Sequence, residues 1–82
     1  MYQDLAAASR RVIGSKQTAR ALERESVKAV YIARDADERV VRDLKDMCLA
    51  KDVPVIIVDS MLELGKVCGI EVGAASAAIL HH

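Results

Sequence analysis

The apolar positions of this chain fall into short runs, separated by stretches in which apolar residues have helical spacing. Three runs, at 27–33, 53–58 and 74–80, predict strands, and a shorter run at 11–13 predicts a fourth. Residues 53–58 are apolar on both faces, which indicates an interior strand of the sheet. Pro54 lies near the start of that strand, where a missing N–H group is tolerated.

Helical spacing is clearest between the second and third runs, where one apolar stripe follows the helix period. The stripe consists of Val40, Val41, Leu44, Met47 and Cys48. Asp35 and Glu38 have the spacing of a capping box for this helix. Ser60 and Glu63 have the same spacing before the last helix, and Gly69 is placed to end that helix in a left-handed conformation. These signals predict where the two helices begin and where the second one ends.

Helices and strands therefore alternate along the chain, beginning with a helix and ending with a strand. This order predicts an α/β fold, a three-layer α/β/α sandwich with a four-stranded mixed sheet. The chain has 82 residues, enough for one core and too few for two, so residues 1–82 are expected to form a single domain. Hydrophobic residues make up 52% of the chain and aromatic residues 2%, which predicts an aliphatic core.

Charge and cysteine usage restrict the classes of function. Twelve basic and twelve acidic residues give a net charge of zero, so nucleic-acid binding would need a local basic patch. Cys48 and Cys68 have neither CxxC spacing nor a histidine cluster nearby, so we expect buried thiols in a reducing compartment and no metal site. No signal peptide or membrane-length apolar segment is present, which favours a cytoplasmic, soluble protein that binds no membrane. His81 and His82 are assigned no role.

The segment "IGSKQTARAL", residues 13–22, carries the most informative chemistry. A helix that begins at Gly14 or Ser15 presents free N–H groups and the positive end of its dipole, and Ser15 is most simply its cap. Lys16, Arg20 and Arg24 then form a basic stripe, whereas Ala21 and Leu22 are expected to face the sheet. Lysine and arginine on a helix surface most often form only a solvated face. A nucleotide phosphate is a weaker alternative, because no GxxxxGK[ST] or GxGxxG motif is present.

A second informative segment is the loop after Gly69. Its apolar residues Ile70 and Val72 lie where loops are normally polar, so we expect one of them to cover the core and the pair to indicate a contact surface. Catalysis finds no support, because no serine or cysteine has a histidine partner before the last two residues. We therefore expect no enzyme, no catalytic residues and no cofactor.

Two motifs together resemble a known family. "GSKQTARALERESVKAVYIARDAD", followed at the family's distance by "LGKVCGIEVGAASAAI", is similar to the ribosomal-protein L-seven-Ae family of kink-turn RNA binders, specifically its short bacterial YbxF-type branch. The resemblance covers residues 7–80 and implies the same α/β/α sandwich. It also implies an RNA target, the kink-turn, an internal loop sharply bent beside tandem sheared G·A pairs.

The resemblance also implies the residues that contact RNA. In the family, the glycine-led helix enters the widened major groove at the G·A pairs. By position, Gly14 permits close approach beside Ser15, Lys16 and Gln17 address guanine edges, and Arg20 and Arg34 contact the backbone, with Asp35 helping to position basic side chains. The loop residues that would pack at the bulge are Ile70, Glu71, Val72 and Gly73.

This chain departs from the archaeal and eukaryotic members of that family at three of these positions. Many of those members carry asparagine and glutamate in place of Lys16 and Gln17, and lysine in place of Arg20. The implied partner is a structured RNA with a kink-turn, such as ribosomal RNA or a riboswitch, bound by a monomer that does not bind DNA. The alternative is a ribosome-associated adaptor that uses Ile70 and Val72 to contact protein and has weak or no RNA specificity.

Overall fold

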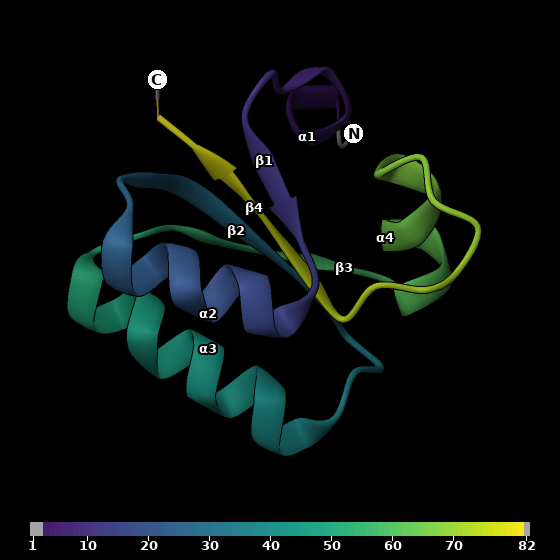
Figure 1. Cartoon of the computed structure of the whole chain (residues 1–82). Coiled ribbons are helices and arrows are strands. Elements are labelled where there is room, and N and C mark those ends of the chain that lie inside the picture. Colours follow the sequence, from purple (N-terminus) through teal and green to yellow (C-terminus); the bar gives the residue numbers. More distant parts are fainter. Residues whose placement is uncertain (1–2, 82) are drawn as a thin grey trace.

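A computed structural model of the chain describes residues 3–81. Helices and strands alternate along it (Figure 1). In order, the elements are α1 (Gln3–Ala7), β1 (Arg11–Ile13), α2 (Ser15–Arg24), β2 (Val27–Ala33), α3 (Glu38–Lys51), β3 (Val55–Val58), α4 (Met61–Val67) and β4 (Ser76–Leu80). The predicted order of elements is confirmed, and the last strand is two residues shorter at its start than the apolar run suggested.

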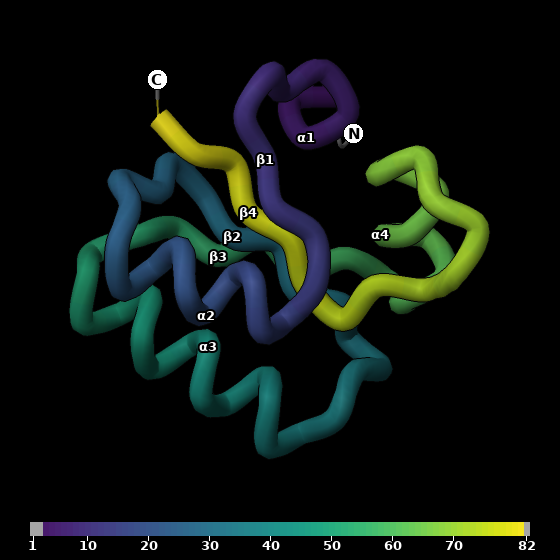
Figure 2. The backbone as a smooth tube through the Cα atoms, viewed as in Figure 1, coloured from purple at the N-terminus to yellow at the C-terminus, as the bar shows by residue number. Residues whose placement is uncertain are grey.

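The four strands form one mixed sheet in the order β1-β4-β2-β3. Strands β2 and β3 are parallel, with Ala33 opposite Val58, while β4 is antiparallel to both β1 and β2. Figure 2 shows β4, the last strand in the chain, lying between β1 and β2. The predicted four-stranded mixed sheet is confirmed.

The prediction that residues 53–58 form an interior strand is wrong. β3 is an edge strand, and Ile57 is 39% exposed. Its apolar side chains contact both cores, since Val55 packs under α2 and α3 and Val58 packs under α1 and α4, and such contacts do not require a strand on each side. The interior positions belong to β4 and β2.

Helices cover both faces of the sheet, as the three-layer prediction requires (Figures 1 and 2). Helices α2 and α3 lie on one face, and α1 and α4 lie on the other. The core under α2 and α3 contains Leu22, Val30, Ile32, Leu44, Cys48 and Ala78. The core on the other face contains Leu5, Tyr31, Ala33, Val58, Leu64, Cys68, Ala74, Ala77 and Ile79. Both cores are built almost entirely from aliphatic side chains, and the predicted stripe of α3 faces the first of them.

The prediction that Asp35 caps α3 is wrong. Asp37, not Asp35, caps α3, and its Oδ1 accepts hydrogen bonds from the N–H groups of Arg39 at 2.9 Å and Val40 at 3.4 Å. Asp35 instead accepts from the N–H of Met61 at 2.8 Å, so it ties the end of β2 to the start of α4. The predicted cap of α4 is confirmed, since Oγ of Ser60 lies 3.0 Å from the N–H nitrogen of Glu63.

Helix α4 ends in the left-handed conformation predicted for Gly69, whose φ is 78°. The N–H of Gly69 donates to the carbonyl of Lys66 at 3.0 Å, and the N–H of Ile70 donates to the carbonyl of Gly65 at 3.0 Å. This pair of bonds is a Schellman motif, which satisfies the last carbonyls of the helix and turns the chain back along it.

Arg11 joins the two helices on the α1 and α4 face to the sheet. Its guanidinium donates to the carbonyl of Leu5 at 3.0 Å and to the carbonyl of Cys68 at 2.9 Å, both near helix C-termini. Cys68 and Cys48 are free, buried thiols, as predicted. Burial raises the pKa of both thiols, although the Arg11 charge partly opposes this for Cys68. No helix within residues 3–81 combines the length and the apolar character needed to span a membrane.

Candidate nucleic-acid interface

One edge of the sheet brings together three of the predicted site segments. Gly14 follows β1, Arg34 follows β2, and the loop of residues 70–75 leads into β4, which runs in the opposite direction. Backbone hydrogen bonds join them, because the N–H of Gly14 donates to the carbonyl of Ser76 at 2.8 Å and the N–H of Ala33 donates to the carbonyl of Ala75 at 2.9 Å. Figure 1 shows the three connections on the same side of the sheet.

Gly14 is the N-cap of α2 and has φ 104° and ψ 153°, a conformation essentially limited to glycine. The first hydrogen bond of the helix runs from the N–H of Thr18 to the carbonyl of Gly14 at 2.9 Å. The N–H groups of Ser15, Lys16 and Gln17 precede that bond, and no side chain within the described residues caps them. The positive end of the helix dipole therefore opens at this edge of the sheet.

The prediction that Ser15 caps α2 is wrong, because it is the first residue of the helix. Its hydroxyl oxygen lies 3.2 Å from that of Ser76, which in turn lies 3.3 Å from that of Thr18. Thr18 and Ser76 are completely buried. This chain of hydroxyl groups fixes the first turn of α2 against the start of β4. It therefore fixes the position of α2 relative to the loop of residues 70–75, which leads into β4.

Sequence reasoning did not identify Thr18 and Ser76 as contributors to the site. A signal was present for Ser76, because it is the one polar residue inside an otherwise apolar run at 74–80. Thr18 lies on the same helix face as Ala21 and Leu22, which are 4% and 2% exposed as predicted. A polar residue on an apolar face usually has a buried hydrogen-bond partner.

Replacing Thr18 with valine removes this hydroxyl while keeping the side-chain shape. We expect the free energy of unfolding to fall by about 1 kcal/mol, because Ser76 loses one of its two hydroxyl neighbours in a buried position. Urea unfolding would measure the loss. Thr18→Ser keeps the hydroxyl and is the matched control; equal unfolding curves for wild type and Thr18→Val would show that the hydroxyl chain does not stabilise α2.

The basic stripe predicted for α2 is exposed to solvent. Lys16, Gln17, Arg20 and Arg24 are all exposed, and the opposite face of the helix is buried. The protein has no net charge, yet α2 presents three cations from one surface, beginning at the helix end that also carries the positive dipole. Glu23 is the one acidic residue of α2, so the helix carries an excess of positive charge that favours an anionic ligand.

Arg34 extends this positive region from the end of β2. Its guanidinium lies 3.6 Å from the carboxylate of Asp59, and the side chains of the two residues are 71% and 81% exposed. An ion pair this exposed contributes little stability, about 0–1 kcal/mol. A phosphate can therefore replace Asp59 as the partner of Arg34 at small cost.

The loop of residues 70–73 divides as predicted between core and surface. Ile70 is half-buried and packs against the core under α4, whereas Val72 is 68% exposed. Glu71 and Gly73 are exposed as well. The loop lies directly on α4, because the carbonyl of Val72 occupies the space beside Gly65 and a hydrogen bond of 3.0 Å links the N–H of Ala74 to the carbonyl of Met61. These contacts with α4 hold the backbone of Val72 in place, and its side chain is exposed to solvent.

The amino-acid sequence matches the model of the Ribosomal protein L7Ae/L30e/S12e/Gadd45 family over residues 2–82. The chain belongs to this family. Among its relatives, an RNA-binding protein of Halalkalibacterium halodurans is 51% identical over 78 residues, 95% of each chain. RNA-binding protein YbxF of Geobacillus stearothermophilus is 44% identical over 79 residues, 96% of each chain. The resemblance seen in the two sequence motifs is thereby confirmed.

The fold of the L7Ae/L30e/S12e/Gadd45 family is also evident from solved structures. The Giardia lamblia 15.5kD RNA binding protein superimposes with a TM-score of 0.85 and 28% identity, covering 98% of this chain and 68% of that one. The family and its named relatives are described by RNA binding and ribosomal membership, not by catalysis. Within the described residues, no group of three or more His, Cys, Asp or Glu side chains is arranged to hold a metal ion.

Proposed function

We propose that this protein binds structured RNA at kink-turns and stabilises their bent conformation, acting as a monomer in the cytoplasm. The proposal rests on family membership, on relatives named as RNA-binding proteins, and on the edge of the sheet described above. The protein's target would be a structured RNA with such a bend, for example ribosomal RNA, a riboswitch or a guide RNA.

The observation that carries the proposal is the exposed first turn of α2 behind Gly14. A glycine at this point lets the backbone approach a nucleic-acid groove closely, and the free N–H groups favour an electron-rich partner. Lys16 and Gln17 project from this turn and are exposed. A lysine donates to O6 and N7 of guanine, and a glutamine both donates and accepts at a base edge. These groups suit the guanines of sheared G·A pairs.

The cations around this turn suit the second requirement of a bent RNA, the close approach of its phosphates. Arg20 lies one helical turn beyond Lys16, and Arg34 adds a charge from the neighbouring strand end. Bending an RNA duplex brings phosphates together, and cations that contact them offset the repulsion. A protein that binds only the bent form shifts the population toward it without any chemical step.

Val72 supplies an apolar contact on the other side of the same edge. Its exposed side chain would pack against the unstacked base or sugar at the bulge. The absence of a side chain at Gly73 lets the loop backbone pack closely against Met61. The adaptor hypothesis requires a larger apolar surface than this loop offers, because Ile70 contributes to the core. RNA is therefore the better-supported partner for the loop.

Replacing Lys16 with alanine should weaken binding to a kink-turn duplex by about 1–3 kcal/mol, the typical value of a side chain that reads a guanine edge. Calorimetric titration at fixed salt and without magnesium would measure it. The matched control is Lys45→Ala, which removes an exposed lysine from α3. Both variants should unfold like the wild type.

A second duplex, with its G·A pairs replaced by Watson–Crick pairs, tests the proposal itself. The wild type should bind and bend only the first duplex, as followed by energy transfer between end labels. Equal affinity for the two duplexes would contradict kink-turn recognition. Binding to neither would return attention to the adaptor hypothesis and to the surface around Val72.

A further inference from the structure

A shallow groove runs between β1 and α2, beginning at the proposed RNA site. Its volume is about 210 Å³, and its lining residues are Val12, Gln17, Arg20, Ala21, Arg24 and Glu25. Gln17 and Arg20 belong to the proposed kink-turn site, whereas the remaining lining lies further from the helix start. The groove is therefore continuous with the site and leads away from it along α2.

The lining of this groove suits a sugar-phosphate backbone. Arg20 and Arg24 are exposed along one side, one helical turn apart, which places them about 6 Å from each other along the axis. That separation is similar to the distance between neighbouring phosphates of one RNA strand. Val12 is half-buried and Ala21 is buried, so the floor is apolar and can accept the face of a ribose.

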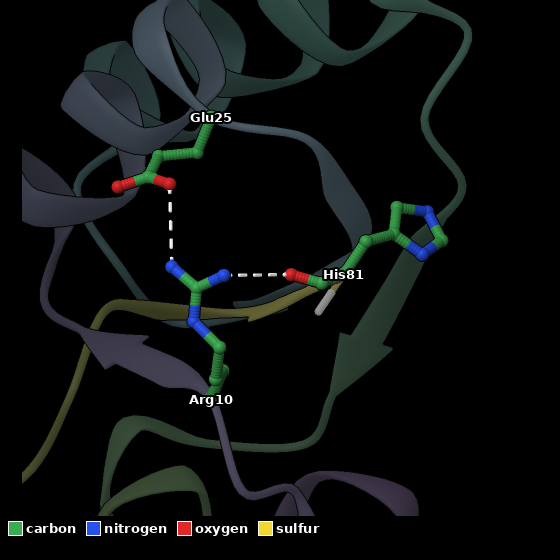
Figure 3. Close-up of polar contacts among 3 residues, drawn as sticks. All are labelled: Arg10, Glu25 and His81. Carbon is green, nitrogen blue, oxygen red and sulfur yellow. Dashed lines mark hydrogen bonds and ion pairs between the residues drawn. The ribbon is translucent and has the colours of Figure 1, made fainter.

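The acid in the groove lining, Glu25, is paired with a residue outside the groove. Figure 3 shows the guanidinium of Arg10 between Glu25 and His81. One Nη of Arg10 lies 3.3 Å from Oε1 of Glu25, and the other donates to the carbonyl of His81 at 2.9 Å. The Arg10 and Glu25 side chains are about half exposed. Because Arg10 offsets the Glu25 charge, Arg20 and Arg24 are the remaining charged residues in the groove lining.

We infer that this groove binds the phosphodiester backbone of the RNA stem that leaves the bend, with Arg24 contacting a phosphate beyond the G·A pairs. Arg10 is a positioning residue in this interaction, because it neutralises Glu25 and does not itself line the groove. The inference rests on the proposed function, and it extends the contact surface from the bend to the adjoining stem. Its consequence is that affinity depends on the length of one of the two stems.

The first test compares three kink-turn duplexes. One has two long stems, of about ten base pairs each, and the other two have either stem shortened to about three. We expect Arg24→Ala to weaken binding to the first duplex about threefold to tenfold and to lower the slope of log K against log salt by about 0.7 to 0.9. Shortening the stem that Arg24 contacts should remove this effect, and shortening the other stem should not. Lys45→Ala, the exposed control on α3, should leave affinity and slope unchanged.

The second test addresses Arg10 through Glu25. Arg10→Gln should weaken binding to the long duplex by about twofold to threefold, because the Glu25 carboxylate then faces phosphate without a partner. The double variant Arg10→Gln/Glu25→Gln should recover the affinity of the wild type. If Arg10 acted only by holding the His81 carbonyl, the second substitution would not restore binding.

These outcomes separate the inference from the function on which it rests. Unchanged affinity of Arg24→Ala for all three duplexes, with discrimination of G·A pairs intact in the wild type, would overturn the groove and leave kink-turn recognition standing. An equal effect of Arg24→Ala on all three duplexes would place its contact inside the bend and overturn the stem contact. Loss of G·A discrimination by the wild type would overturn the proposed function itself.

Discussion

Gly14→Ala is expected to lower the free energy of unfolding by about 1–3 kcal/mol and to remove most of the affinity for a kink-turn. Alanine has to adopt φ 104° and ψ 153°, where an L-residue is strained, or the turn between β1 and α2 has to change. That turn is tied to β4 by the 2.8 Å hydrogen bond from the N–H of Gly14 to the carbonyl of Ser76. Relief of the strain would therefore loosen the start of α2.

Backbone strain, and not a steric clash, dominates this prediction. A Cβ at residue 14 would lie 2.8 Å from Oε1 of Gln17, but that atom ends a flexible, exposed side chain and can move away. Its movement would still matter for binding, because Gln17 is a proposed contact to a base edge. Affinity should consequently fall further than stability alone would explain.

Urea unfolding and titration with a kink-turn duplex would measure the two losses. Cys48→Ala is a control for stability, because it creates a small cavity under α3, within the core and away from the candidate site. At temperatures where both variants are folded, Cys48→Ala should bind RNA normally and Gly14→Ala should not. A Gly14→Ala protein with the affinity of the wild type would show that this turn does not approach the RNA closely.

The fold was largely predictable because its elements follow from local patterns. The stripe of α3, the cap at Ser60 and the left-handed Gly69 depend on residues within one or two turns of each other. The position of β3 in the sheet does not, since its apolar residues indicate covered faces and carry no information about the strand beside it. Lateral strand order is a property of contacts distant in sequence.

The helix caps illustrate the same limit at the level of single residues. Asp35 and Asp37 both precede α3, and the spacing of Asp35 to Glu38 favoured the wrong one. Asp37 directly adjoins the helix and accepts from its first free N–H groups, whereas Asp35 accepts from the N–H of a residue 26 positions later, at the start of α4. No local pattern shows that β2 and β3 end side by side, which is what brings Asp35 to Met61.

The candidate site was predictable for residues whose side chains are exposed and unpredictable for those that hold it together. Lys16, Gln17 and Arg20 stand out in sequence because of their charge and their place after Gly14. The buried hydroxyls of Thr18 and Ser76 join a helix to a strand 58 residues away, so only the folded chain shows their contact. The contact of the loop with α4 is likewise absent from the sequence pattern.

Gly65→Ala is expected to lower the free energy of unfolding by about 1–2 kcal/mol and to displace the loop that presents Val72. Alanine inside a helix is favoured over glycine by about 0.5–1 kcal/mol. Against this gain, a Cβ at residue 65 would meet the backbone carbonyl oxygen of Val72 at an impossible 2.1 Å. Overpacking of this kind costs about 1–3 kcal/mol, so the clash outweighs the helical preference.

The loop has to move because the clash involves its backbone. The same Cβ would lie 3.1 Å from the carbonyl carbon of Val72 and 3.2 Å from Cα of Gly73, so a side-chain rotation cannot relieve it. Lifting the loop would strain the 3.0 Å hydrogen bond between the N–H of Ala74 and the carbonyl of Met61. Amide hydrogen exchange should therefore rise at Ala74 in the variant and remain slow in β2.

Val72→Ala separates the position of the loop from the chemistry of its side chain. The side chain is 68% exposed, so its truncation should leave unfolding nearly unchanged and remove only the apolar contact to RNA. Gly65→Ala should weaken kink-turn binding more than Val72→Ala does, because it displaces Glu71, Val72 and Gly73 together relative to α2. If the two variants bind equally well, the loop contributes only the Val72 side chain. If both bind like the wild type, the loop lies outside the RNA interface, and recognition depends on α2 and the end of β2.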